Sequence, residues 1–146
     1  HHDAGGAMGL IVNQPLGDLP LARVLESFGL DAEGVRGDLT VHYGGPVLPT
    51  RAFVLHTPDY SDPSTEVVAG GIAVTADRAI LDAIAHGQGP REALFALGYA
   101  GWAGGQLESE IRAGAWVTVP ADRALLFDAD AARKWERAMA RRKIQL

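Results

Sequence analysis

The spacing of apolar residues predicts an amphipathic helix between positions 18 and 29. Its apolar residues recur at intervals of three and four, which places them on one face of a helix; they are Leu21, Val24, Leu25 and Phe28. Asp18 is expected to cap this helix, Pro20 fits its first turn, and Gly29 suits its end.

Similar spacing predicts further helices later in the chain. We expect them over residues 75–87, 104–114, 122–127 and from 128 onward. Thr75 and Asp128 are the expected N-caps of the first and last of these. In the last helix Trp135 and Met139 lie four positions apart, on one face, and Trp135 is expected to anchor the core or an interface.

Short apolar or alternating runs predict the strands. They cover residues 8–13, 39–43, 52–57, 66–74, 94–100 and 115–119. The fourth run is one strand, or two strands interrupted at Gly70-Gly71. Residues 58–65 are turn-formers throughout and predict a surface loop. Because strands and helices are mixed without strict alternation, the pattern favours an α+β fold over a doubly wound sheet.

Length and composition indicate one domain. The chain has 146 residues, of which 47% are hydrophobic and 21% charged, the values of an ordinary globular protein. It has no cysteine, which excludes disulfides, thiolate metal sites and a cysteine nucleophile, and which is typical of a cytoplasmic protein. No apolar run approaches the ~18 residues of a membrane span, and no signal peptide is visible.

Charge is distributed unevenly along the chain. The formal net charge is −5, which disfavours general nucleic-acid binding, but residues 133–143 carry six cations against one acid, Glu136. The cations are Arg133, Lys134, Arg137, Arg141, Arg142 and Lys143. This tail is a solvated helix end whose cations complement the helix dipole, or a contact for phosphates or an acidic partner.

Residue patterns for catalysis and for metal binding are sparse. None of the four serines lies in a Gly-x-Ser-x-Gly elbow. His42, His56 and His86 lack metal-ligand spacing, although strand pairing could bring the first two onto one face. The sequence therefore assigns no catalytic residue, no metal site and no cofactor.

Residues 98–108 place two aromatic side chains among four glycines, ahead of a helix. Free backbone N–H groups at such a corner can hold an anion, but Glu108 and Glu110 would repel one, and no lysine accompanies the glycines. The alternative is a glycine corner that lets Trp102 pack. Its one polar face comprises Tyr99, Gln106 and Glu108.

Several of these segments together resemble the bacterial AlgH/YqgE family. The matching segments are residues 6–13 with Pro15, 44–47, 51–56, 97–102, 105–110, 115–116, 120–122 and 125–127. The resemblance implies an α+β fold with mostly antiparallel strands curled into a partial barrel and flanked by helices. The family is largely uncharacterised, with a genetic link to transcriptional control of exopolysaccharide synthesis, so no catalytic residue is carried over.

The ends of the chain depart from this family. Members usually have some two dozen residues, including a strand, before the segment that matches residues 6–13. We expect the chain to lack such an N-terminal strand, since the buried strand at 8–13 needs partners on both sides. The ending at residues 143–146 looks shortened, and Gln14 stands where the family often has arginine.

Three functional hypotheses follow. The first is a non-enzymatic cytoplasmic binding or regulatory protein, a monomer or weak homo-oligomer, whose groove meets a protein or small-molecule partner. The expected groove residues are Asn13, Gly44, Gly45, Pro46, Arg51, His56, Tyr99, Trp102, Gln106 and Glu108. The second is an enzyme acting on a nucleotide or phosphorylated metabolite, with Glu108 or His56 as general base. The third is DNA binding through the basic tail.

Overall fold

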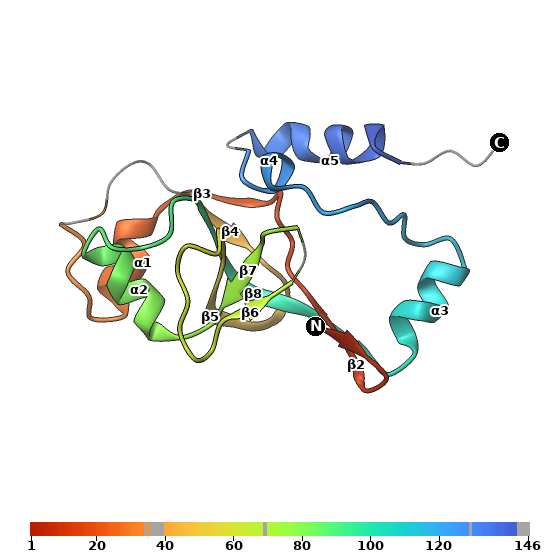
Figure 1. Ribbon diagram of the computed structural model, residues 1–146, viewed down its shortest axis with the longest axis horizontal. Helices are drawn as coiled ribbons and strands as arrows, with labels where there is room; N and C mark the ends of the chain where they lie inside the picture. The colour runs from red at the N-terminus through yellow and green to blue at the C-terminus, as the bar shows by residue number, and fades with distance from the viewer. Residues whose placement is uncertain (34, 36–39, 69, 129, 143–146) are drawn as a thin grey trace.

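The fold is an α+β arrangement of short helices around a curled sheet (Figure 1). A computed structural model describes residues 1–146 except 34, 36–39, 69, 129 and 143–146. The strands are β1 (His2–Asp3), β2 (Gly6–Gly9), β3 (Pro15–Pro20), β4 (Thr40–Tyr43), β5 (Val47–His56), β6 (Glu66–Val67), β7 (Ala73–Thr75) and β8 (Ala93–Ala103). The helices are α1 (Leu21–Ser27), α2 (Arg78–Ala85), α3 (Gln106–Arg112), α4 (Arg123–Leu126) and α5 (Ala131–Ala140).

The sheet is organised around β8, its longest strand. The strand order is β1-β2-β8-β5-β7-β6, and β4 pairs with both β3 and β8. Every pairing is antiparallel except that of β4 with β8. The first half of β8 pairs with β4 and β5, and its second half pairs with β2. The predicted α+β class and curled sheet are confirmed.

The main core lies between the sheet and the helix pair α1 and α2, which cover one end of the molecule (Figure 1). Its buried side chains include Leu21, Val24, Leu25, Val41, Val54, Ile80, Leu81, Ile84 and Phe95. Full burial of one such side chain stabilises the fold by roughly 1.5–3 kcal/mol. The apolar spacing that predicts α1 therefore identifies its buried face correctly.

Three helix starts were predicted too early. The N-cap of α1 is Pro20, while Asp18 lies within β3. The N-cap of α2 is Asp77, because Thr75 is buried and its hydroxyl is hydrogen-bonded to the imidazole of His56 at 2.7 Å. The N-cap of α5 is Asp130 instead of Asp128. Thr75 and Asp128 are engaged by side-chain contacts, and Asp18 belongs to the strand that precedes the helix.

The strand predictions differ mainly at residues 115–119, which form no strand. This segment leaves α3 and returns outside the sheet to α4, so it has no neighbouring strand to pair with (Figure 1). Trp116 is 48% exposed and Trp135 is 64% exposed, so neither is a core residue. Residues 66–74 form two strands, β6 and β7, and Leu39 of the predicted strand 39–43 lies outside the described residues.

In the described part of the chain, no helix is long and apolar enough to cross a bilayer.

Candidate functional site

Two glycine segments cross each other at backbone distance and shape the site. Gly98, within β8, has a φ of 77°. A Cβ at this position would lie 2.3 Å from the carbonyl oxygen of Gly45, and one at Gly44 would lie 2.3 Å from the carbonyl oxygen of Gly98. Because neither position has room for a side chain, both segments require glycine. The expected groove residues Gly44 and Gly45 thus serve to bring β5 close to β8.

This crossing forces an irregularity into β5. Between two paired positions β5 advances from Val47 to Ala52 while β8 moves only from Tyr99 to Leu97. The extra residues form a bulge, in which Leu48 has a φ of 46°, a strained conformation for a branched side chain. Bulges of this kind re-aim side chains, and here the bulged segment carries Leu48 and Arg51 to the mouth of a cavity.

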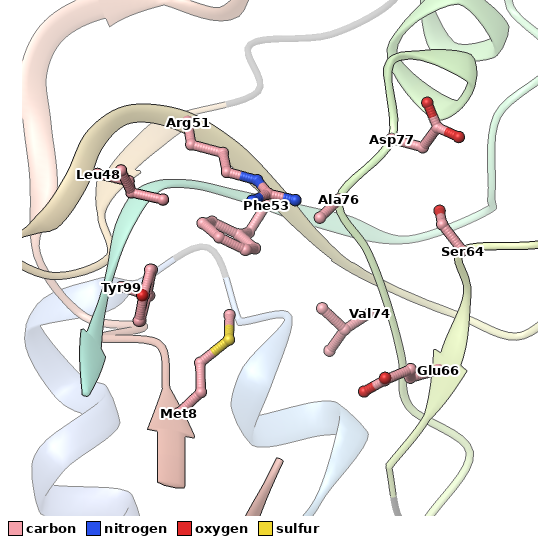
Figure 2. A pocket seen from close by; sticks show the side chains of 10 residues that line it. All are labelled: Met8, Leu48, Arg51, Phe53, Ser64, Glu66, Val74, Ala76, Asp77 and Tyr99. Atoms are coloured by element: carbon pink, nitrogen blue, oxygen red, sulfur yellow. The ribbon is translucent and has the colours of Figure 1, made fainter. Parts of the chain in front are cut away.

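The cavity, which we call the Arg51 cavity, has a volume of about 560 Å³ (Figure 2). Its lining comes from β2, β5, β6, β7 and β8 and from the residues just before β6 and α2. The residues are Met8, Leu48, Arg51, Phe53, Ser64, Glu66, Val74, Ala76, Asp77 and Tyr99. Side chains from both ends of the curled sheet therefore meet around one open space.

Arg51 extends its guanidinium group across an aromatic surface at the edge of this cavity (Figure 2). The guanidinium carbon is 5.4 Å from the centroid of the Phe53 ring, a cation–π distance. The Phe53 and Tyr99 rings are 5.7 Å apart in an edge-to-face arrangement. None of the described carboxylates forms an ion pair with Arg51, so its planar fork of donors remains available to a ligand.

The walls of the cavity differ in chemistry. Ser64, Glu66 and Asp77 lie on one side, while Met8, Leu48 and Tyr99 lie on the other (Figure 2). The first wall offers hydrogen-bond acceptors and negative charge, and the second offers apolar and aromatic surface. Together with Arg51, the cavity can hold an apolar group, an anionic group and hydrogen-bond donors at the same time.

Of the expected groove residues, Arg51 and Tyr99 line this cavity. Trp102 lies in a neighbouring, more open hollow of about 550 Å³, which shares Met8 and Tyr99 with the Arg51 cavity. These three expected residues are thus brought to one continuous surface. Pro46 is exposed beside the glycine crossing, and Asn13 is half-buried between β2 and β3.

Gln106 and Glu108 belong to a different contact set, which holds α3 against the end of β8. The side-chain oxygen of Gln106 accepts from the backbone N–H of Ala103 at 2.9 Å, and its nitrogen donates to Glu110 at 3.0 Å. Glu108 is hydrogen-bonded to His2, and this contact lowers the pKa of the Glu108 carboxyl. The predicted face of Tyr99, Gln106 and Glu108 therefore separates into two parts.

His56 is fully buried, and both of its ring nitrogens are hydrogen-bonded. Nδ1 donates to the carbonyl of Thr57 at 2.8 Å, and Nε2 contacts the hydroxyl of Thr75 at 2.7 Å. His42 and His56 are not brought together, because β8 lies between their strands. Among the described residues, no cluster of three His, Asp or Glu side chains is suited to a metal ion.

Sequence reasoning missed Met8, Ser64, Glu66 and Asp77 as site residues. Ser64 belongs to the predicted loop and Glu66 to a two-residue edge strand, and neither carries a motif. Only the curl of the sheet brings them opposite Arg51. Met8 belongs to a segment that was predicted as a strand. Side chains of a strand point alternately to its two faces, and the sequence does not indicate which face lines a cavity.

The comparisons with known proteins agree with this fold. The AlgH-like family model matches residues 1–146. A UPF0301 protein of Thioalkalivibrio sulfidiphilus is 44% identical over 145 residues, covering 99% of this chain and 77% of the relative. A UPF0301 protein of Caulobacter vibrioides is 48% identical over 142 residues, covering 96% and 73%.

One solved structure leads to the same family, and a second shows the same fold. The solution structure of the AlgH protein from Pseudomonas aeruginosa has a TM-score of 0.80 and 41% identity, covering 99% of this chain and 77% of that one. A crystal structure of a Corynebacterium diphtheriae protein, at 19% identity and a TM-score of 0.78, shows the same fold over 99% of this chain and 75% of its own. The family match extends from the first residue to the last, and the chain belongs to the AlgH-like family.

Proposed function

We propose that the chain is a non-enzymatic binding protein that acts in the cytoplasm as a regulatory protein. Its ligand is an apolar amino acid or a short peptide, free or at the end of a partner chain, held in the Arg51 cavity. The observation that carries this proposal is the arrangement of Arg51, without a carboxylate partner among the described residues, opposite Glu66 and Asp77 across apolar and aromatic surface.

Each part of such a ligand has a counterpart in the cavity. An α-carboxylate matches the planar donors of Arg51, which favour two parallel hydrogen bonds. Ammonium or amide N–H groups match the carboxylates of Glu66 and Asp77 on the opposite wall. An apolar side chain fits against Met8 and Tyr99, and a volume of about 560 Å³ lies within the usual range for small-ligand sites.

The positions of the alternative catalytic residues favour binding over catalysis. His56 is buried, and both of its ring nitrogens are hydrogen-bonded. Glu108 contacts His2 beyond the C-terminal end of β8, whereas β4 pairs with the N-terminal half of that strand. Neither side chain lines the Arg51 cavity. A general base must lie within hydrogen-bond reach of the proton that it removes.

The basic tail gives less support to DNA binding than its sequence suggests. Arg137 pairs with Asp128, Arg141 pairs with Asp122, and Lys134 is 4% exposed. These three cations are therefore committed to contacts within the molecule. Arg133 and Arg142 are exposed and remain able to contact phosphates.

Calorimetric titration with glycyl-L-phenylalanine and with its methyl ester tests the proposal. The ester lacks the carboxylate that Arg51 is proposed to bind. We expect Arg51→Met to weaken binding of the dipeptide at least tenfold, since a charge-assisted hydrogen bond contributes about 1.5–3 kcal/mol. The same substitution should change binding of the ester by less than twofold.

Matched variants control for a general loss of charge. Arg23→Met and Glu26→Gln alter exposed side chains of α1, away from the cavity, and should leave both titrations unchanged. Glu66→Gln should weaken the dipeptide and the ester alike. Absence of saturable binding to the unmodified protein at millimolar dipeptide, or equal effects of Arg51→Met and Arg23→Met, would refute the proposal.

A further inference from the structure

A second cavity, under the C-terminal helix, carries a buried cation that the Arg51 cavity does not use. Lys134 of α5 is 4% exposed. Its ammonium group donates one hydrogen bond, to the backbone carbonyl of Val12 at 2.8 Å. Among the described residues no carboxylate forms an ion pair with it. Burial without a partner disfavours the charged form and lowers the pKa of Lys134.

The cavity beside this ammonium has a volume of about 300 Å³ and lies between β4, β8 and the start of α5. We call it the Lys134 cavity. Its polar lining comprises Thr40, His42, Asp128 and Lys134, and its apolar lining includes Leu94 and Phe127. A lysine has three N–H donors, so two remain after the bond to Val12.

His42 presents a second polar atom to this space. It is 7% exposed, and its Nδ1 donates to the carbonyl of Phe95 at 3.2 Å. The backbone of Thr40 is a further hydrogen-bond partner of the ring. Burial and the charge of Lys134 lower the pKa of His42, which favours the neutral form of the ring.

The other charged groups near the cavity offset each other. Asp128 is paired with Arg137, and its carboxylate also accepts from the backbone N–H of Asp130 at 2.9 Å. The pair leaves no net charge beside Lys134. The helix α5 begins at the cavity wall with Ala131, and its N-cap Asp130 makes no side-chain capping bond.

From this geometry we propose that the Lys134 cavity is a second ligand site, which binds the oxyanion of a small carboxylate or phosphoryl compound. The oxyanion accepts from the two free donors of Lys134, and Thr40 adds a hydroxyl at the rim. The apolar body of the ligand packs against Leu94 and Phe127. This pairing supplies the opposite charge that a buried ammonium otherwise lacks.

The sequence offers a direct probe, because it contains two lysines, Lys134 and Lys143. Protein labelled with ¹³C at the lysine ε-carbon gives two signals, which Lys143→Arg assigns. The protein is titrated with sodium butanoate and, separately, with inorganic phosphate, while sodium chloride keeps the ionic strength constant. We expect the Lys134 signal to move saturably with at least one anion, whereas the signal of Lys143, which lies outside the described residues, serves as the reference.

The two anions identify the ligand chemistry. Saturation with butanoate alone indicates a carboxylate with an apolar body, and saturation with phosphate alone indicates a phosphoryl group. If neither anion saturates the Lys134 signal, or if both lysine signals drift alike, the proposal is wrong. This readout uses the unmodified side chain, so it does not depend on a variant that folds poorly.

Variants separate this site from the Arg51 cavity. Lys134→Met keeps an unbranched side chain, one atom shorter and without the ammonium group. It should weaken anion binding at least tenfold, as measured by backbone amide shifts. Arg51→Met should change it by less than twofold. Equal losses in the two variants would overturn the assignment to the Lys134 cavity, whereas failure of the dipeptide titration alone would leave this site unaffected.

Discussion

The indole nitrogens of Trp102 and Trp116 donate to the same carboxylate oxygen, Oε2 of Glu110, at 3.1 and 2.7 Å. The two rings are 5.8 Å apart in an edge-to-face arrangement. Gln106 donates to the other oxygen of the carboxylate at 3.0 Å. The helix α3 has no buried residue. The hydrogen bonds to the Glu110 carboxylate therefore hold this helix and the segment after it against β8.

The hydrogen bonds to Glu110 predict a specific acid dependence. The bonds from Trp116, Gln106 and Trp102 lower the pKa of the Glu110 carboxyl. Their stabilising effect is complete above the unfolded-state pKa of about 4.3 and is lost as pH falls through the lower folded-state pKa. In NMR spectra, the indole N–H signals of Trp102 and Trp116 should therefore titrate with a midpoint below 4.3.

Trp135 is exposed on α5 and serves as an internal control, since its indole signal should not follow this titration. Glu110→Gln should abolish the common transition of the other two indoles. A midpoint at or above the value of free glutamate, or a transition that survives Glu110→Gln, would contradict the assignment.

The close crossing at Gly98 predicts a large cost for the smallest side chain. Gly98→Ala places a Cβ 2.3 Å from the Gly45 carbonyl at a φ of 77°. We expect the free energy of unfolding to fall by about 2–3 kcal/mol. Gly114→Ala is the matched control: its φ is 79°, but a Cβ there has open space, so only the backbone strain of about 1 kcal/mol applies. Urea denaturation of both variants measures the difference, and equal losses would exclude a steric role for the crossing.

Replacement of Leu48 by glycine should raise the stability of the fold and weaken dipeptide binding. Its φ of 46° is unfavourable for leucine, and its side chain is 51% exposed at the rim of the Arg51 cavity. Leu48→Gly relieves this strain and should raise the free energy of unfolding by up to about 1 kcal/mol. The same change removes apolar surface, so dipeptide affinity should fall. Loss of stability in this variant would show that the bulge does not require the left-handed conformation.

Because His42 is buried, the free energy of unfolding should decrease as the pH falls below neutrality. Burial and the nearby ammonium of Lys134 lower its folded-state pKa, whereas in the unfolded chain the pKa is about 6.5. The unfolded state therefore binds the proton first, and stability decreases as pH falls from 6.5 toward the folded-state pKa. Denaturation between pH 7.5 and 5 should show this slope in the unmodified protein and in His86→Asn, which replaces the exposed histidine at the C-cap of α2. His42→Asn should flatten it, and an unchanged slope would contradict the account.

The sequence predicts the elements better than their boundaries. The apolar spacing of Leu21, Val24 and Leu25 places α1 and its buried face, because a helix needs only local periodicity to be recognised. Thr75 looks like a cap in sequence, yet its hydroxyl is bound to His56, nineteen positions away. Residues 115–119 have the composition of a strand, but strand formation requires a neighbour that local sequence cannot reveal.

Of the residues that line the candidate site, only those beside the glycine segments were predicted from the sequence. Arg51 and Tyr99 were expected beside the glycine segments, and the crossing of those segments does place them at one cavity. Glu66 and Asp77 reach the same cavity only through the curl of the sheet, which depends on long-range pairing. Lys134 looked like one cation of a solvated tail, because an amphipathic pattern does not show which charged side chain is buried.

The most direct test of the Arg51 cavity uses the two methionines of the chain, Met8 and Met139. Met8 lines the cavity, whereas Met139 lies on α5 outside it. With ¹³C-methyl methionine labelling, titration with glycyl-L-phenylalanine should move the Met8 signal saturably and leave the Met139 signal in place. The Arg51→Met variant adds a third methionine signal, which is assigned separately. In this variant the dipeptide concentration that half-saturates the Met8 shift should be at least tenfold higher. A Met8 signal that stays fixed, or one that moves together with Met139, would contradict the proposed binding site.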